Sequence, residues 1–134
     1  MNFQTLNIWA ILAAAVSAFV LGGLWYSPML FGVPWKKANG FGPDQPPPPT
    51  AMVFVVSFML SLIMSFNLAM FLNDPKTTLA WGATAGFLAG FGWVFMGIAI
   101  VSLFERRPWS YVFVNGGYLT VALVAMGAIL GGWR

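Results

Sequence analysis

The stretch Thr50–Leu72, TAMVFVVSFMLSLIMSFNLAMFL, decides the fold class of this chain because it contains no Lys, Arg, Asp or Glu. Its length is near the roughly 20 residues that a helix needs to cross a hydrocarbon core of about 30 Å. Its Val, Phe, Leu and Ile side chains together favour membrane insertion by about 4 to 7 kcal/mol. The polar residues Ser57, Ser61, Ser65 and Asn67 offset only part of this gain. We therefore expect a transmembrane helix here.

Three further stretches, Leu6–Tyr26, Thr78–Phe104 and Trp109–Trp133, share this property. A Lys or Arg at mid-membrane would cost about 2.5–3.5 kcal/mol, and the sequence keeps all its Lys, Arg, Asp and Glu side chains outside the four stretches. They are Lys36, Lys37, Asp44, Asp74, Lys76, Glu105, Arg106, Arg107 and Arg134. The sequence predicts an all-α fold, an integral membrane four-helix bundle that is antiparallel, with the termini on the same side. We expect one transmembrane domain, residues 1–134, with spans at about 6–26, 50–72, 78–104 and 109–133.

The composition excludes several classes of function. With 60% hydrophobic and 7% charged residues, the chain has no room for a soluble domain beside the spans. A net charge of +3 gives no electrostatic footprint for nucleic acid. Cys and His are absent, which excludes thiol chemistry and His-ligated metals or pigments. We therefore expect no catalytic, cofactor-binding or metal residues, no cofactor and no enzyme, and Glu105 alone is more typical of an ion pair than of a general base.

The basic residues predict how the chain is oriented in the membrane. The first and third loops carry Lys36, Lys37, Arg106 and Arg107, whereas the other side carries Lys76, Arg134 and the terminal amine. The positive-inside rule then places the first and third loops in the cytoplasm and both termini outside. The segment before the first stretch has no positive charge, so we expect a retained span and not a signal peptide.

The connections contain helix-start signals. Asp74 and Pro75 predict an N-cap and a first helical residue for the third span, and Thr50 an N-cap for the second. The few residues between the third and fourth spans force an antiparallel hairpin. In the longer first loop, Pro46–Pro49 predicts a stiff polyproline II spacer, which we favour over a recognition ligand.

Small residues recur four apart in every span. Because lipid gives no hydrophobic drive for helix association, close approach through small residues must supply the packing. The strongest of these patterns is the doubled G-x-x-x-G of Gly82, Gly86 and Gly90, which we expect to be a helix-packing ridge. The sequence leaves open whether this ridge lies within the chain or against a second protein.

Polar residues gather at one predicted end of the bundle. Tyr111, Asn115 and Tyr118 share one helix face, and an amide at that depth needs a partner. One interpretation is a small-molecule or lipid-headgroup site. The other, which we favour, is an interhelical hydrogen-bond clamp with a Glu–Arg ion pair. The candidate cluster comprises Trp25, Tyr26, Ser27, Glu105, Arg106, Arg107, Asn115 and Tyr118.

Several of these residues lie in motifs that look familiar. The segments GLWYSP at Gly23–Pro28, FERRPW at Phe104–Trp109 and NGGY at Asn115–Tyr118 resemble a bacterial membrane-protein family of unknown function. The resemblance covers nearly the whole chain and rests on W-Y-S-P, F-E-x-R-P-W and N-x-G-Y elements. It implies a four-span protein of the bacterial inner (plasma) membrane, and no activity, substrate or cofactor. The positions it marks for testing are Trp25, Tyr26, Pro28, Glu105, Arg107, Pro108, Asn115 and Tyr118.

Two functions remain open. The first is a small accessory or scaffolding subunit that acts by helix packing, as a homo-oligomer or inside a larger membrane complex. Its partners would be the lipid bilayer and other membrane chains, with lipid or pigment contacts that need no His. The alternative is a small transporter or channel for a neutral solute or a small anion, since no span contains the embedded carboxylate that proton coupling needs.

Overall fold

The computed structural model describes residues 3–42 and 44–134, and the regular secondary structure of this part of the chain is all helical. The four long apolar helices are α1 (Ile8–Trp25), α3 (Ala51–Phe71), α4–α5 (Leu79–Phe104) and α6 (Trp109–Gly132), with mean hydropathy of 1.8 to 2.2. The third is continuous from α4 (Leu79–Ala89) through a π-helical segment (Gly90–Phe95) into α5 (Met96–Phe104). A short helix, α2 (Gly32–Ala38), follows α1. The predicted all-α class and the four apolar spans are confirmed, which makes this a multi-pass membrane protein.

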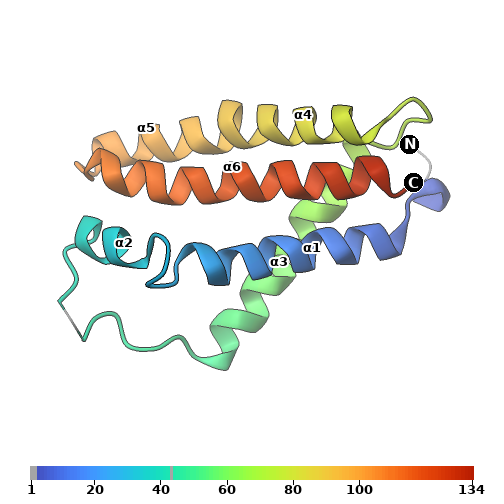
Figure 1. Cartoon of the computed structure of the whole chain (residues 1–134). Coiled ribbons are helices and arrows are strands. Elements are labelled where there is room, and N and C mark those ends of the chain that lie inside the picture. The colour runs from blue at the N-terminus through green and yellow to red at the C-terminus, as the bar shows by residue number, and fades with distance from the viewer. Residues whose placement is uncertain (1–2, 43) are drawn as a thin grey trace.

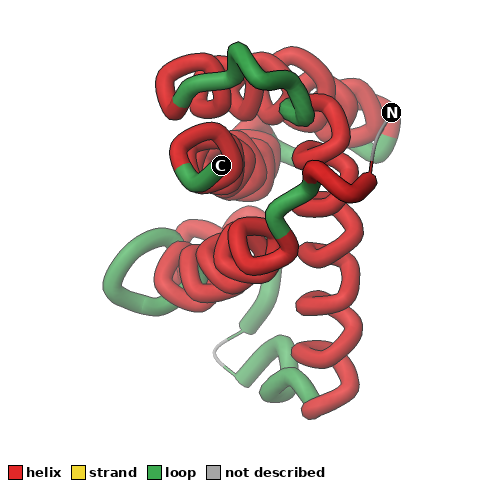
Figure 2. Tube along the Cα trace, turned by 90° about the vertical axis from the view of Figure 1, so that its right-hand side faces the viewer, coloured by secondary structure: helices red, strands yellow, loops and turns green. Residues whose placement is uncertain are grey.

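Helix α6 lies at the centre of the molecule, between α1 and the α4–α5 helix (Figures 1 and 2). At one end, the Asn7 side-chain amide donates to the carbonyl oxygen of Trp133 at 3.3 Å. At the other end, Trp25 Nε1 donates to the carbonyl oxygen of Val114 at 2.8 Å. These two contacts fix the ends of α1 and α6 against each other in opposite directions.

The glycine ridge of α4 lies against α6. A Cβ added to Gly82 would meet the carbonyl oxygen of Gly127, and one added to Gly86 would meet that of Leu123. A Cβ on Gly90 would lie 2.7 Å from Thr120 Cα. The backbones of α4 and α6 therefore approach so closely that no side chain fits between them at these glycines. Small residues allow transmembrane helices to associate through such close backbone contact. The structure thus places the Gly82–Gly90 ridge inside the chain.

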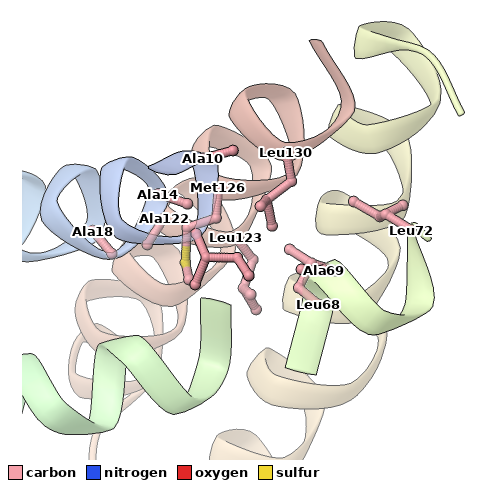
Figure 3. Packing of buried hydrophobic residues seen from close by; sticks show 11 residues of the cluster. Ala10, Ala14, Ala18, Leu68, Ala69, Leu72, Ala122, Leu123, Met126 and Leu130 are labelled. Atoms are coloured by element: carbon pink, nitrogen blue, oxygen red, sulfur yellow. The ribbon is translucent and has the colours of Figure 1, made fainter. Parts of the chain in front are cut away.

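Alanines and one methionine form much of the buried contact between α1 and α6 (Figure 3). Ala10, Ala14 and Ala18 of α1 are buried against Ala122 and Met126 of α6. The C-terminal half of α3 completes this core with Leu68, Ala69 and Leu72.

Helix α3 crosses the other three at a steep angle (Figures 1 and 2). Ser65 Oγ donates to the carbonyl oxygen of Ile11 at 2.7 Å, which anchors α3 on α1. Nearer its start, the rings of Phe54 and Phe58 meet Phe19 edge-on at 6.1 and 5.9 Å. The long connection before α3 does not force it alongside its neighbours, whereas the short turn between α5 and α6 forces a hairpin.

The start of α4 differs from the prediction. Thr78 is the N-cap, and its Oγ1 accepts from the Trp81 N–H at 3.1 Å. Asp74 accepts from the Lys76 N–H at 2.8 Å in the preceding turn, so the expectation that Asp74 and Pro75 begin the helix is wrong. Thr77 ties that turn to the end of α3 through a 2.9 Å bond to the carbonyl oxygen of Leu72, which delays the helix start.

Candidate functional site

The polar centre of the candidate site is a pair formed by Tyr26 and Asn115. Tyr26 caps the C-terminal end of α1, and its hydroxyl donates to Asn115 Oδ1 on α6 at 2.6 Å. Asn115 Nδ2 donates in turn to the carbonyl oxygen of Tyr111, one turn earlier, at 3.0 Å. Both ends of the amide are therefore paired, as burial away from water requires.

Two further side chains on this level bond backbone carbonyls of the facing helix. Tyr118 on α6 donates to the carbonyl oxygen of Ala18 on α1 at 2.8 Å. Trp25 on α1 donates to the carbonyl oxygen of Val114 on α6. The bonds run in both directions across the interface, so each helix positions a ring over the other.

Two glycines make room for these rings. A Cβ on Gly22 would lie 3.0 Å from the Tyr118 hydroxyl oxygen, and one on Gly117 would lie 3.1 Å from Trp25 Cζ2. With that space open, the Tyr118 ring reaches the Tyr26 ring at 5.5 Å between centroids, edge-on. A Cβ added at Gly22 or Gly117 would lie closer to these rings than ordinary van der Waals distance, so both glycines are part of the site.

Helix α2 and its N-cap residue add aromatic side chains that were not among the predicted site residues. Trp35 meets the Tyr26 ring edge-on at 5.7 Å, and Phe31 lies 4.5 Å from the Trp25 ring. Gly32 allows this fold-back, because a Cβ there would lie 2.5 Å from the Tyr26 carbonyl oxygen. The available signal was the i, i+4 spacing of Phe31 and Trp35, followed by a helix-ending Asn39-Gly40 pair.

The structure divides the eight predicted residues into two groups. Trp25, Tyr26, Asn115 and Tyr118 form the bonded network between α1 and α6. Ser27 does not join it, because its hydroxyl donates to the carbonyl oxygen of Leu24 at 2.7 Å. Glu105, Arg106 and Arg107 lie in the turn between α5 and α6 and are exposed.

The charged residues of this turn form a surface group of their own. Arg107 Nε lies 3.5 Å from Glu105 Oε2, and the Arg107 guanidinium lies 5.1 Å from the Tyr111 ring centroid. An exposed ion pair of this kind contributes about 0–1 kcal/mol. The turn faces the end of α2 across an open hollow of about 750 Å³, which we call the basic hollow. Its lining is Lys37, Ala38, Asn39, Gly40, Glu105, Arg106, Arg107 and Pro108.

The opposite end of the molecule holds a second hollow, of about 370 Å³, between the start of α1 and the ends of α3 and α6. Arg134 lies in its lining and donates from Nη1 to the Leu72 carbonyl oxygen at 3.0 Å and from Nη2 to that of Asp74 at 2.8 Å. A guanidinium here satisfies carbonyls at the C-terminal end of α3 and complements its dipole. From the sequence, Arg134 is predicted only to contribute to the charge balance that sets the topology.

The chemistry available to the site is hydrogen bonding and charge. Within residues 3–42 and 44–134, no three His, Cys, Asp or Glu side chains come together as metal ligands. The network between α1 and α6 uses its donors and acceptors internally. The basic hollow, in contrast, presents cationic groups to the outside.

The fold and this network define a multi-pass membrane protein, and its 134 residues are held together by glycine-mediated helix contacts and by hydrogen bonds between α1 and α6. The sequence model of a family described as "Protein of unknown function (DUF1761)" matches residues 9–131, and the chain belongs to this family. The resemblance to an uncharacterised family is therefore confirmed. Comparison with curated proteins and comparison with solved structures each gave no match.

Proposed function

We propose that this protein is a non-enzymatic accessory or scaffolding subunit that acts by helix packing and assembles with a second copy of itself through α3. The observation that carries the proposal is the exposed face of α3. Val53, Val56, Leu60 and Ile63 are between 46% and 65% exposed, although each lies within an apolar span. With Asn67, which is also exposed, they repeat at alternating steps of three and four residues.

This spacing is the a/d repeat of a coiled-coil seam. The seam lies on the side of α3 opposite Ser65, the residue that bonds α1, because the positions two residues away from Ser65 point nearly the other way around a helix. The α1 contact therefore leaves the seam available to another chain.

Asn67 indicates that this face of α3 contacts another protein chain and not lipid alone. Its side chain forms no hydrogen bond with any residue of 3–42 or 44–134, and it lies about 6 Å along the helix axis from the end of α3. An amide facing hydrocarbon without a partner is costly, and acyl chains offer none. An Asn at one a position pairs with its copy across a seam and sets the register.

The interior of the chain favours this proposal over a passage for solutes. Between the two hollows, α1 and α6 are in contact through Ala10, Ala14, Ala122 and Met126, each at most 1% exposed. The polar groups of the α1–α6 network are bonded to one another or to backbone. These contacts support a structural role for the interior polar residues.

The absence of Cys from the chain makes cross-linking the direct test. Single variants Leu60→Cys and Ile63→Cys should form disulfide-linked dimers on mild oxidation in native membranes. Ile100→Cys on α5 is the matched control, because Ile100 is 58% exposed, close to the 55% of Leu60. Adding Asn67→Leu to Leu60→Cys should lower the dimer yield by severalfold.

The cross-linking outcomes separate the alternatives. Efficient linking on α3 with little at Ile100 supports the seam, whereas equal linking at both positions would refute assembly through α3. Recovery of a different protein at equal stoichiometry, with no self-linking, would replace the homo-oligomer with a larger complex.

The second candidate function is a small transporter or channel for a neutral solute or a small anion. It is supported by the two hollows, which lie at opposite ends of the molecule and contain Arg134 and the cations of the basic hollow in their linings. Flux of a small anion into liposomes containing the purified protein, reduced by Arg107→Ala, would favour it. We also propose that the protein lies in the bacterial inner membrane, as the family resemblance implies. The Lys and Arg distribution supports an orientation with the first and third loops cytoplasmic and both termini outside.

A further inference from the structure

Two helix ends that face the basic hollow have the same backbone geometry. At the end of α5, the Arg107 N–H bonds the Ser102 carbonyl at 2.9 Å and the Arg106 N–H bonds the Leu103 carbonyl at 3.2 Å. At the end of α2, the Phe41 N–H bonds the Lys36 carbonyl at 2.9 Å and the Gly40 N–H bonds the Lys37 carbonyl at 3.1 Å. Both are Schellman motifs, which place one residue in the left-handed region.

The residues in these two left-handed positions differ. Gly40 adopts a φ of +70°, which glycine reaches without steric cost, whereas Arg106 adopts a φ of +59° with its Cβ in place. Within the part of the chain that the structure describes, Arg106 is the non-glycine residue with positive φ. The fold thus tolerates at Arg106 a conformation that glycine would adopt more favourably, and such strain collects at functional positions.

The strained arginine belongs to a group of cations with little internal pairing. Lys37 and Arg106 form no ion pair or side-chain hydrogen bond with residues 3–42 or 44–134. Arg107 has its Nε near Glu105, so one carboxylate stands against three cations in the lining of the hollow. The hollow therefore carries an excess of positive charge that the chain itself does not neutralise.

The position of the basic hollow indicates the source of the missing anion. It lies where the span Leu79–Phe104 ends and the span Trp109–Gly132 begins, and therefore at one face of the membrane. Lipid phosphates lie at this depth, and Trp109, 56% exposed, is typical of the same interface. Guanidinium and ammonium groups are the donors that phosphate oxygens accept from.

We propose that the basic hollow binds the phosphate of an anionic phospholipid headgroup, with Lys37, Arg106 and Arg107 as its ligands. A cation near a helix C-terminus also complements the helix dipole, but Arg107, the next residue, supplies that charge without left-handed strain. Neutralising the dipole therefore does not account for an arginine at the Arg106 position. Binding of an anion in the hollow does.

The test measures lipid binding and stability on the same variants. Purified protein in neutral detergent is titrated with dioleoylphosphatidylglycerol or dioleoylphosphatidylcholine, and bound lipid is counted by native mass spectrometry. Arg106→Gly and Arg106→Ala should each weaken phosphatidylglycerol binding about fivefold, the change expected for one basic residue at an anionic surface. Only Arg106→Gly should also raise the melting temperature, because it removes the left-handed strain.

Lys76→Ala is the matched control, since it removes one cation whose side chain has no ion pair among residues 3–42 and 44–134. This cation lies in the turn before α4, away from the hollow. It should leave the lipid preference unchanged. Equal binding of the two lipids by the unmodified protein, or an equal loss in Lys76→Ala and Arg106→Ala, would refute the site. Capture of inorganic phosphate without selection of phosphatidylglycerol would refute the lipid headgroup as the ligand. None of these results depends on assembly through α3.

Discussion

The substitution Gly86→Ala is the sharpest test of how α4 and α6 meet. The added methyl group would meet the Leu123 carbonyl oxygen, and it would lie 2.6 Å from the carbonyl carbon of Leu123 and 3.0 Å from Val124 Cα. All three atoms are backbone, so no side chain can rotate out of the way. The helices must separate, and the close contacts at Gly82 and Gly90 on the same ridge weaken with them.

The expected magnitude follows from two opposing effects. Overpacking costs about 1–3 kcal/mol, and the rigid obstruction here favours the upper end of that range. Replacing a helical glycine by alanine returns up to about 1 kcal/mol of helix propensity. We therefore expect Gly86→Ala to lower the free energy of unfolding by about 2 kcal/mol.

The same helix offers a matched control in Gly97, where an added Cβ has nothing within 4 Å. Gly97→Ala should be neutral or raise the free energy of unfolding by up to about 1 kcal/mol. Unfolding in mixed micelles with increasing dodecyl sulfate, followed by circular dichroism, gives both values. Two variants that unfold within about 0.5 kcal/mol of each other would show that the α4–α6 backbones do not approach as described.

Three further predictions concern other parts of the chain. Asn115→Leu leaves the Tyr26 hydroxyl without its acceptor and should lower the free energy of unfolding by about 1–2 kcal/mol. A double-mutant cycle with Tyr26→Phe should give a coupling energy of about 0.6–1.7 kcal/mol. Additive effects of the two substitutions would contradict the 2.6 Å hydrogen bond. Reporter fusions after Asn39 should be cytoplasmic and fusions after Asp74 external, and the reverse pattern would invert the topology. Thr78→Ala removes the N-cap of α4 and should cost about 1 kcal/mol in the same unfolding assay, whereas an unchanged stability would argue against the cap.

Hydrocarbon as a solvent explains why the spans can be predicted from sequence. A charge at mid-membrane is so unfavourable that its exclusion from four long segments leaves a clear pattern. The four long helices begin and end within two residues of the predicted span ranges, although the third does not start at Pro75 as its turn residues had suggested. The pairing of Asn115 was likewise expected, because an amide at that depth needs a partner. The sequence offered Trp25, Tyr26 and Ser27 as candidates, and the choice of Tyr26 depends on how far its side chain extends past the end of α1.

Other features depend on weak or distant contacts that no local pattern encodes. The direction of α3 depends on the hydrogen bond from Ser65 to Ile11, because the long connection before α3 does not constrain the angle at which this helix crosses the others. The fold-back of α2 depends on the close approach of Gly32 to the Tyr26 carbonyl oxygen and on the ring contacts of Trp35 with Tyr26 and of Phe31 with Trp25. The separation of the Glu105–Arg107 pair from Asn115 likewise follows from the turn geometry at Arg106, which sequence spacing does not reveal.

By itself, the sequence determined that the chain crosses a membrane with four helices, because insertion free energy is a sum over residues in each segment. Only the tertiary structure decided that the Gly82–Gly90 ridge is used within the chain, that the far face of α3 is left open, and that three cations share one hollow. Those outcomes depend on which helix faces which. That choice is made by shape complementarity between whole helices, since lipid solvates the apolar faces of all of them equally well.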